Sequence, residues 1–286
     1  MDLYSYLGLS RQSVYQMLQR QGSSFERSRQ FIEKAEILRK KHPEMGCRKM
    51  ALILKERGYG RDKIEGLLIA GGFRVYYPPN FVKTTHSVRT NQFDNLIEGL
   101  TIRGINKVVQ TDITYLWIKE RFYYLVFIID VYSRVIIGYH ASCGLESEAN
   151  IKALQMMIQL RKKGNIKGLI HHSDRGGQYN SLAYLKILQD HGIKISMCKA
   201  AWENAYTERI NRTIKHEYLR HRQIDCLETL RKELKRAVHL YNNQRPHWSL
   251  CQQKSPVEYE KYVSSLPERK RPVMTIYKKE DRTSTN

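Results

Sequence analysis

The sequence predicts an α/β protein in which an α-helical region precedes a mixed β-sheet flanked by helices. Apolar runs at helical spacing dominate the first part of the chain, and β-rich runs joined by short turns follow Lys107. A polar, proline-bearing stretch lies between them. We therefore expect a helical region over residues 1–77, a linker over 78–104, a core over 105–222, and a helical extension with a basic tail over 223–286.

The first region has the pattern of helix-turn-helix segments. Residues 7–15 resemble the turn and second helix of such a motif, with Gly8 in the turn and Ser10 as the helix cap. The polar residues 20–33 form either a linker or an exposed helix. Two short helices with basic flanks follow, the second over residues 63–70. Such a pair fits DNA docking, and it fits simple packing equally well.

The core pattern predicts the sheet. Strands over residues 108–118, 123–130 and 134–139 are joined by short turns, which predicts an antiparallel meander. Helices and strands then alternate. We expect helices over residues 147–160, 182–188, 202–219 and 227–241, and strands over 168–171 and 193–197. The order β-β-β-α-β-α-β-α indicates a mixed sheet with helices after the meander.

Charge points to a polyanionic partner. The 286 residues carry 49 Lys+Arg against 28 Asp+Glu, a net charge of +21, and nucleic acid is the most common partner of such a chain. The alternative is a solvated basic surface. The charge is uneven, because residues 101–150 are neutral whereas residues 151–200 carry nine basic and two acidic groups.

Composition excludes other classes of protein. At 41% hydrophobic and 27% charged residues the chain is neither collagen-like nor disordered. Its longest apolar run is far shorter than the roughly 20 residues that span a bilayer. Five scattered cysteines argue against a disulfide framework or a zinc site, so we expect a cytoplasmic protein with no membrane association.

Three carboxylates stand out in this basic chain. Asp112 lies inside an apolar strand, where a charge is unfavourable unless it is paired or metal-bound. Asp174 follows the fourth strand and precedes two glycines, and Glu208 lies on the next-to-last helix. If the three converge, they would hold two hard cations about 4 Å apart, the arrangement used for phosphoryl transfer. The alternative is surface carboxylates that never meet.

Several motifs resemble the insertion sequence 3 family of bacterial transposases, specifically its OrfB-type catalytic protein. They are "QTDITYLW" around Asp112, "IIDVYSRVIIGYH" around Asp130, "HHSDRGGQY" around Asp174 and "ENAYTERINRTIKHE" around Glu208. Beyond these, "HPEMGCRKMALILKERGYG" resembles the helix-turn-helix segment of the family, and "YNNQRPHWSL…SPVEY" resembles its C-terminal signature. The resemblance covers about residues 40–262.

The resemblance implies a ribonuclease-H-like fold with a five-stranded sheet and a DDE catalytic triad. By position in the motifs, Asp112, Asp174 and Glu208 would be catalytic and would bind two Mg²⁺, with Mn²⁺ as a possible substitute. Asp130 matches a structural position. Lys215, seven residues after Glu208, would hold a DNA phosphate from the same helix face, unless it is simply solvated.

One departure from the family concerns the glutamate. Thirty-three residues separate Asp174 and Glu208, two fewer than is usual in the family. Glu203 and Glu217 are the competing acids. The alignment of N-A-x-x-E favours Glu208, and Glu203 lies about 140° away around a helix, so only one of the two can face the site.

The expected function is DNA transposition. The chain would cut at the ends of an insertion element with Mg²⁺ and transfer the freed 3′-OH strand into DNA. The alternatives are a non-transposing nuclease with the same core and an inactive DNA-binding regulator. Besides Lys215, the candidate DNA-binding residues are Arg209, Arg212, Arg48, Lys49 and Arg11.

The expected partners are double-stranded DNA, both terminal inverted repeats and target, and further copies of the chain. An upstream helix-turn-helix protein, separate or fused by frameshifting, is a further expected partner, because the helix-turn-helix at the start of this chain is cut short. We expect the protein to act in the bacterial cytoplasm, on the nucleoid.

Overall fold

The computed structural model describes residues 8, 10–76, 93–145, 147–162, 164–199 and 201–277. Contacts divide the chain into two compact units, Met1–Pro79 and Asn80–Asn286. Among the described helices, none is both long and apolar enough to cross a membrane.

The first unit is helical, as the sequence predicts. It contains α2 (Arg11–Lys41), α3 (Cys47–Leu54) and α4 (Arg61–Ala70). The hydroxyl of Ser10 caps α2 by accepting the backbone N–H of Ser13 at 3.0 Å, so this cap is where the sequence places it. Residues 20–33 are helical rather than a linker. Residues 1–7, where a preceding helix of the motif would fall, lie outside the described part.

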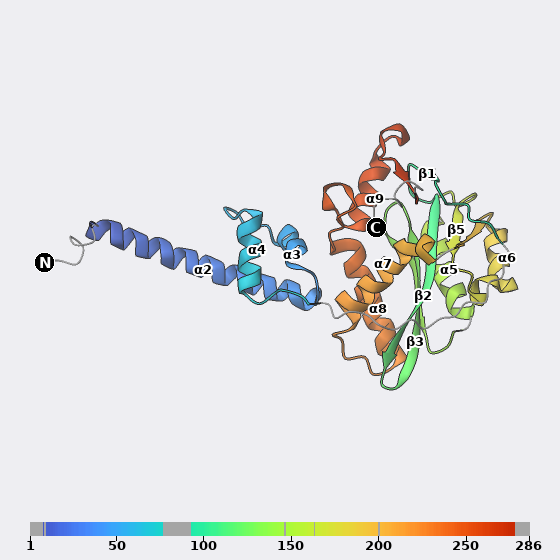
Figure 1. The fold of residues 1–286 in the computed structure, drawn as a ribbon, viewed down its shortest axis with the longest axis horizontal. Helices are drawn as coiled ribbons and strands as arrows, with labels where there is room; N and C mark the ends of the chain where they lie inside the picture. Colours follow the sequence, from blue (N-terminus) through green and yellow to red (C-terminus); the bar gives the residue numbers. More distant parts are fainter. Residues whose placement is uncertain are drawn as a thin grey trace, which may run out of the picture. The chain divides into compact units, whose positions relative to one another are not determined.

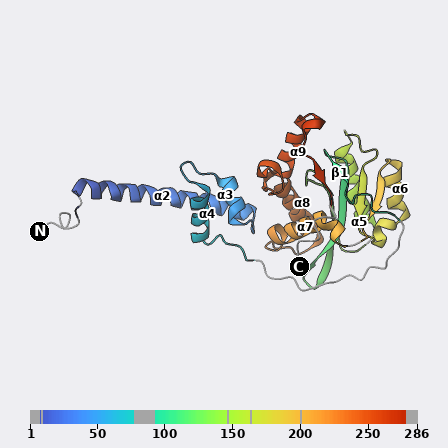
Figure 2. The same cartoon turned by 45° about the horizontal axis from the view of Figure 1, so that its top comes forward.

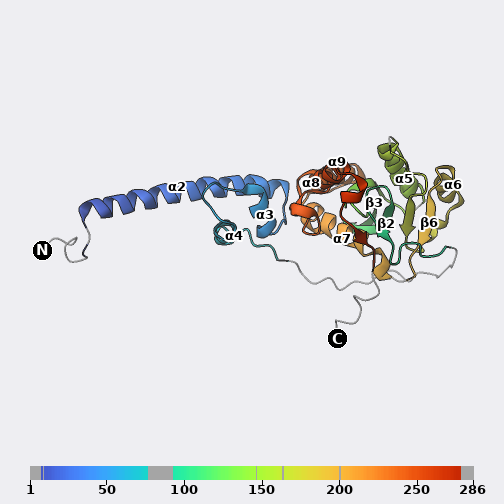
Figure 3. The ribbon, with the colours of Figure 1, turned by 90° about the horizontal axis from the view of Figure 1, so that it is seen from above.

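A small apolar core holds the first unit together. Phe31 and Ala35 of α2 are fully buried against Met50 of α3 and Leu68 of α4. The buried residues of α2 are thus confined to its second half, and α3 and α4 lie against that half in the view from above (Figure 3). The first half of α2 is mostly exposed, and its apolar side chains Tyr15, Met17, Leu18 and Phe25 are exposed with it.

The second unit is built on a mixed five-stranded sheet (Figure 1). The strands are β2 (Val108–Ile118), β3 (Arg121–Asp130), β4 (Ile136–Ser142), β5 (Ile170–Ser173) and β6 (Lys194–Met197). Their order is β4-β3-β2-β5-β6. The β2–β3–β4 meander is antiparallel, and β5 and β6 join it in parallel to β2. This topology and its helices confirm the ribonuclease-H-like fold.

Helices cover both faces of the sheet (Figure 2). They are α5 (Ser147–Arg161), α6 (Leu182–Asp190), α7 (Ala205–Thr213) and α8 (Leu227–Gln244), with α9 (Pro256–Ser265) further along the chain. Strand β3 shows how the faces divide. Leu125 and Phe127 pack with α7 and α8, whereas Val126 and Ile128 pack with α5 and α6, as the two-residue repeat of a strand requires.

Close approach of α5 to the sheet depends on a glycine. A Cβ added at Gly138 of β4 would collide with the carbonyl oxygen of Ala153 in α5, and it would lie 3.3 Å from Ile128 Cδ1. The absence of a side chain at this position therefore lets the helix backbone touch the sheet.

The turn between β3 and β4 is organised by Asp130. Its fully buried carboxylate accepts backbone N–H groups from Asn106 at 2.8 Å, Tyr132 at 3.0 Å and Ser133 at 2.9 Å. These bonds satisfy donors that the turn would otherwise bury without partners. The geometry is that of a structural carboxylate, which agrees with its position in the family motif.

Two very short strands tie distant segments of the second unit together. Strand β1 (Thr101–Ile102) pairs antiparallel with β7 (Met274–Thr275). The side chain of Ile97 before β1 is fully buried with that of Ile276. Residues 94–104, which the sequence assigns to the linker, thus pack into the second unit, whereas residues 78–92 lie outside the described part.

The helix that follows β6 changes its winding. Residues Ala201–Asn204 form a short 3₁₀ turn (η2), α7 follows, and Ile214–Leu219 continue as a π-helix (η3). The sequence predicts one continuous helix over 202–219, and the structure divides it into these three parts. π-Helical turns are rare and occur often at functional sites.

Candidate active site

Asp112 lies in the middle of β2 and points toward α7. In the antiparallel register it is opposite Phe127, whose side chain belongs to the core beneath α7 and α8, and opposite residues share a face. The Oδ2 atom of Asp112 accepts a 2.7 Å hydrogen bond from Nδ2 of Asn211 on α7. Strand and helix thus fix this carboxylate from two sides.

Asp174 lies directly beyond the end of β5, the strand that runs parallel to β2. Its Oδ1 atom accepts the backbone N–H of Gly176 at 3.0 Å. A Cβ at Gly176 would lie 3.0 Å from that oxygen and 2.9 Å from Gln178 Oε1. The glycine therefore allows the backbone to approach the carboxylate closely, as the paired glycines of the sequence suggest.

Glu208 occupies the first turn of α7 and is solvent-exposed. The competing acids have other surroundings. Glu203 is buried and accepts the backbone N–H of Lys199 at 2.5 Å. Glu217 is buried in an ion pair with Arg245, with bonds of 2.7 and 2.6 Å. The negative charge of Glu208 raises the pKa of Asp112, which supports its assignment to the site.

Electrostatics shows that the three carboxylates are neighbours. Burial raises the pKa of Asp112 well above its usual range, and the negative charges of Asp174 and then Glu208 raise it further. Burial also raises the pKa of Asp174 and that of Glu208. A buried carboxylate whose charge is also disfavoured by two neighbouring acids favours a bound cation. The structure thus brings together the residues that the sequence singles out.

Lys215 lies close to this cluster of carboxylates. Its positive charge lowers the pKa of Asp112, and the negative charge of Asp112 in turn raises the pKa of Lys215. Burial has the larger effect on Lys215 and lowers its pKa overall. Its Nζ atom lies 5.5 Å from the centre of the Tyr115 ring of β2. The lysine is the second residue of the π-helix, so the change of winding begins where this side chain meets the site.

The remaining DNA-binding candidates fall into two groups. Arg209 and Arg212 are exposed on α7 beside Glu208. In the first unit, Arg11 is exposed at the start of α2, Arg48 contacts Glu65 at 3.3 Å, and Lys49 is half-buried. Their contacts with DNA stay a prediction.

Sequence reasoning missed a buried hydrogen-bond network behind Asp112. Gln110 Nε2 donates to the Glu203 carbonyl at 2.9 Å and to the Tyr277 hydroxyl at 3.0 Å. Asn204 Nδ2 donates to the Thr111 carbonyl at 3.0 Å. The bonds join β2 to the turn before α7, so they set the position of Glu208. The only signal in the sequence is the run of polar residues flanking each acid.

The two histidines before Asp174 serve the core. His171 Nε2 lies 2.8 Å from the Tyr184 hydroxyl, and His172 Nδ1 lies 2.8 Å from Ser196 Oγ. Burial lowers the pKa of His171 to about 3 and that of His172 to about 4, so both rings are neutral. They point to opposite faces, as strand alternation predicts, and neither reaches solvent.

The donor set fits a hard divalent cation. Carboxylate oxygen is the ligand that Mg²⁺ prefers, and the raised pKa of Asp112 marks a place where positive charge is missing. Within the described residues, no three His, Cys, Asp or Glu side chains are already drawn together tightly enough to hold a metal.

Comparisons with known families match the second unit. Two family models, both described as integrase core domain, match residues 103–201 and 191–256. Together these ranges contain Asp112, Asp174, Glu208 and Lys215.

Related proteins match over a longer range. A 31 kDa protein of insertion element IS600 from Shigella sonnei is 31% identical over 89% of this chain and 96% of its own length. The transposase for insertion sequence element IS904 of Lactococcus lactis is 32% identical over 69% of this chain and 77% of its own. Transposase InsF for insertion sequence IS3A of Escherichia coli is 33% identical, over 58% of each chain.

Among solved structures, the catalytic core domain of HTLV-2 integrase in complex with magnesium is 20% identical. The match covers 58% of this chain and 99% of that domain, with a TM-score of 0.44.

Proposed function

The chain belongs to the insertion sequence 3 family of DNA transposases, and we propose that its second unit joins element ends to target DNA by direct transesterification. The unit would cut at the end of an insertion element and direct the freed 3′-OH to another phosphodiester. In this proposal Asp112, Asp174 and Glu208 are the catalytic residues. The observation that carries it is the coupling of these three acids, seen in the raised pKa of Asp112.

The acids would hold two Mg²⁺ ions, which Mn²⁺ could replace. Bound there, the ions would supply activation of the attacking oxygen and stabilisation of the leaving oxygen. Asn211 supports this role, because its bond to Oδ2 orients Asp112. The backbone N–H of Gly176 does the same for Asp174.

Lys215 would bind a DNA phosphate next to the reacting bond. Its partial burial lowers its pKa, and Asp112 opposes that effect, so the ammonium lies close to the acids without pairing tightly with them. A phosphate contact fixes the register of the substrate without reading its sequence. Arg209 and Arg212, exposed on α7, would extend this contact along the backbone.

The test is strand transfer on a labelled element end. Asp112→Asn and Asp174→Asn should each abolish Mg²⁺-dependent transfer while DNA binding is retained. Asp190→Asn is the matched control, because Asp190 ends α6 and is exposed outside the site. Unchanged transfer in either site variant would refute the catalytic assignment.

The same assay tests the choice of glutamate. Glu208→Gln should abolish both cutting and joining. Glu203→Gln should keep measurable transfer in whatever fraction folds, because the Glu203 carboxylate accepts the backbone N–H of Lys199 and so serves the turn before α7. The reverse result would transfer the catalytic role to Glu203.

The two alternative functions give different products in this assay. A non-transposing nuclease would yield cut ends without joined products, and an inactive regulator would yield neither. No observation in the structure favours either one, and the named relatives InsF and the IS904 protein are transposases.

We propose further that the protein acts as a multimer on paired element ends, on the nucleoid in the bacterial cytoplasm. An upstream helix-turn-helix protein, separate or fused, would assist end recognition. Sizing of the chain with and without element ends tests the first point: a monomer on paired ends would refute it.

A further inference from the structure

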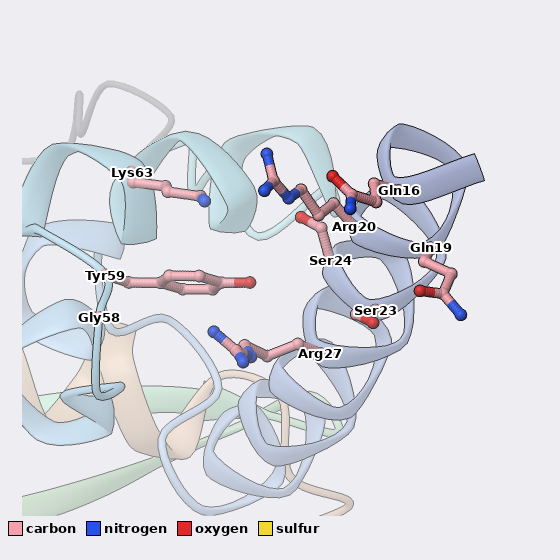
Figure 4. Close-up of a pocket in the computed structure, with 9 residues that line it drawn as sticks. All are labelled: Gln16, Gln19, Arg20, Ser23, Ser24, Arg27, Gly58, Tyr59 and Lys63. Carbon is pink, nitrogen blue, oxygen red and sulfur yellow. The ribbon is translucent and has the colours of Figure 1, made fainter. Parts of the chain in front are cut away.

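The first unit contains a basic cavity that none of the expected DNA contacts uses. It has a volume of about 450 Å³ and lies between the first half of α2 and the residues that lead into α4. Its charged lining residues are Arg20, Arg27 and Lys63, and no Asp or Glu lines it. Figure 4 shows the three cationic side chains extending from two helices toward the space beside the Tyr59 ring.

The wall of the cavity is held in place by the core of the unit. The Tyr59 ring packs edge-on against buried Phe31, with ring centres 6.4 Å apart. Its hydroxyl lies 3.4 Å from Ser28 Oγ. Lys63 Nζ lies over the ring, 4.2 Å from its centre, which places the ammonium before any ligand arrives.

Neighbouring acids are engaged with other cations. Glu26 contacts Arg29 at 3.9 Å, Glu56 contacts Lys34 at 2.9 Å, and Asp62 contacts Arg61 at 3.1 Å. Within the described part of the chain, neither Arg20 nor Arg27 pairs with a carboxylate. The cavity therefore carries about three uncompensated positive charges.

Spacing indicates what could neutralise them. Arg20 and Arg27 are seven residues apart on α2, so their Cα atoms are separated by about 10 Å along the helix axis. One small anion would not satisfy both guanidinium groups and the lysine. A chain of phosphates would, and Ser23 and Ser24 beside the arginines offer hydroxyl donors to the same oxygens.

We propose that this cavity binds the phosphodiester backbone of DNA through Arg20, Arg27 and Lys63. The proposal rests on the proposed function only for the choice of DNA as the polyanion. It adds a contact site in the first unit at a place distinct from Arg11, Arg48 and Lys49, the residues of this unit that the sequence alone suggests.

The test measures binding of the full chain to a short labelled duplex by fluorescence anisotropy at several salt concentrations, in EDTA. Each phosphate contact contributes about 0.9 to the slope of log K against log salt. The triple variant Arg20→Gln/Arg27→Gln/Lys63→Gln should therefore lower the slope by about 2.7. The matched control is Arg29→Gln/Lys34→Gln/Arg61→Gln, which removes the same charge from exposed residues already in ion pairs, and it should lower the slope by less than half as much.

Two results would overturn the proposal: equal losses in both triple variants, or no loss in the cavity variant. If the triple variant fails to fold by circular dichroism, the single variants Arg20→Gln and Arg27→Gln should each lower the slope by about 0.9. The assay contains no metal and no chemical step, so a failure of the catalytic proposal leaves its outcome unaffected.

Discussion

Replacing Arg245 with methionine should destabilise the second unit strongly, because Arg245 and Glu217 form a buried ion pair. Only 7% of the Arg245 side chain and 9% of the Glu217 side chain are exposed. Two parallel bonds of 2.7 and 2.6 Å join them, in the bidentate geometry that is strongest for arginine. The variant keeps a side chain of similar length but leaves the Glu217 carboxylate buried without these bonds.

The expected loss in the free energy of unfolding is about 3–5 kcal/mol, the usual effect of removing one partner of a buried pair. For a unit of this size, each kcal/mol lowers the melting temperature by about 2–4 °C, so the expected drop is roughly 6–20 °C. The pair joins the π-helix to the C-terminal cap of α8. The loss should therefore also loosen the segment that carries Lys215, and strand transfer should slow in the fraction that remains folded.

The assay is denaturant unfolding followed by circular dichroism, in a double-mutant cycle. Glu217→Leu/Arg245→Met removes both charges and should be clearly more stable than Arg245→Met alone. Lys119→Met is the control, because it breaks the exposed pair of Lys119 with Asp225, which is worth at most about 1 kcal/mol. A loss below about 1 kcal/mol in Arg245→Met, or a double variant as unstable as the single one, would refute this reasoning.

Other changes test other contacts. Gly138→Ala should destabilise the unit by about 1–3 kcal/mol, because the new Cβ would meet the Ala153 carbonyl oxygen; an unchanged midpoint of denaturation would contradict the close packing. Tyr277→Phe should lower the free energy of unfolding by about 1 kcal/mol by removing the bond to Gln110, whereas Tyr262→Phe, whose hydroxyl makes no hydrogen bond within the described residues, should have no measurable effect. His171 has its pKa lowered to about 3 by burial, so its contribution to stability is complete above about pH 6.5 and is lost as the pH falls from there toward about 3. His171→Gln keeps a hydrogen-bonding group near Tyr184. The number of protons taken up on unfolding at pH 5, measured by calorimetry in several buffers, should be smaller by about one proton in this variant. Equal uptake in both proteins would mean that the ring is not buried in its neutral form.

The sequence predicted the sheet well because the pattern of apolar residues within each strand is enough to identify it. In β3, side chains alternate between two buried faces, and that alternation is visible from Tyr123 to Ile129. The helix cap at Ser10 was also predictable, because it depends only on residues next to it in the sequence. The length of α2 was less evident, because residues 20–33 are mostly polar and suit a linker as well as a helix.

Features that depend on distant partners left no local signal. Strands β1 and β7 are two residues long and pair across most of the second unit, so neither shows a period. The π-helix contains residue types that suit an α-helix equally well. In the site, the acids could be chosen from motifs, whereas the bond from Asn211 to Asp112 and the contact of Gln110 with Tyr277 required the folded chain.

The hydrogen bond between Gln110 and Tyr277 has a consequence for the timing of synthesis. Asp112 leaves the ribosome long before Tyr277, since 164 residues lie between them in the sequence. At about 5–20 residues per second, that interval lasts roughly 8–33 s. During this interval the strand that carries Asp112 can pair with its neighbours, but the hydrogen bond from Gln110 to Tyr277 behind the site has not yet formed. A nascent chain therefore completes the support of this candidate site only after Tyr277 has been synthesised.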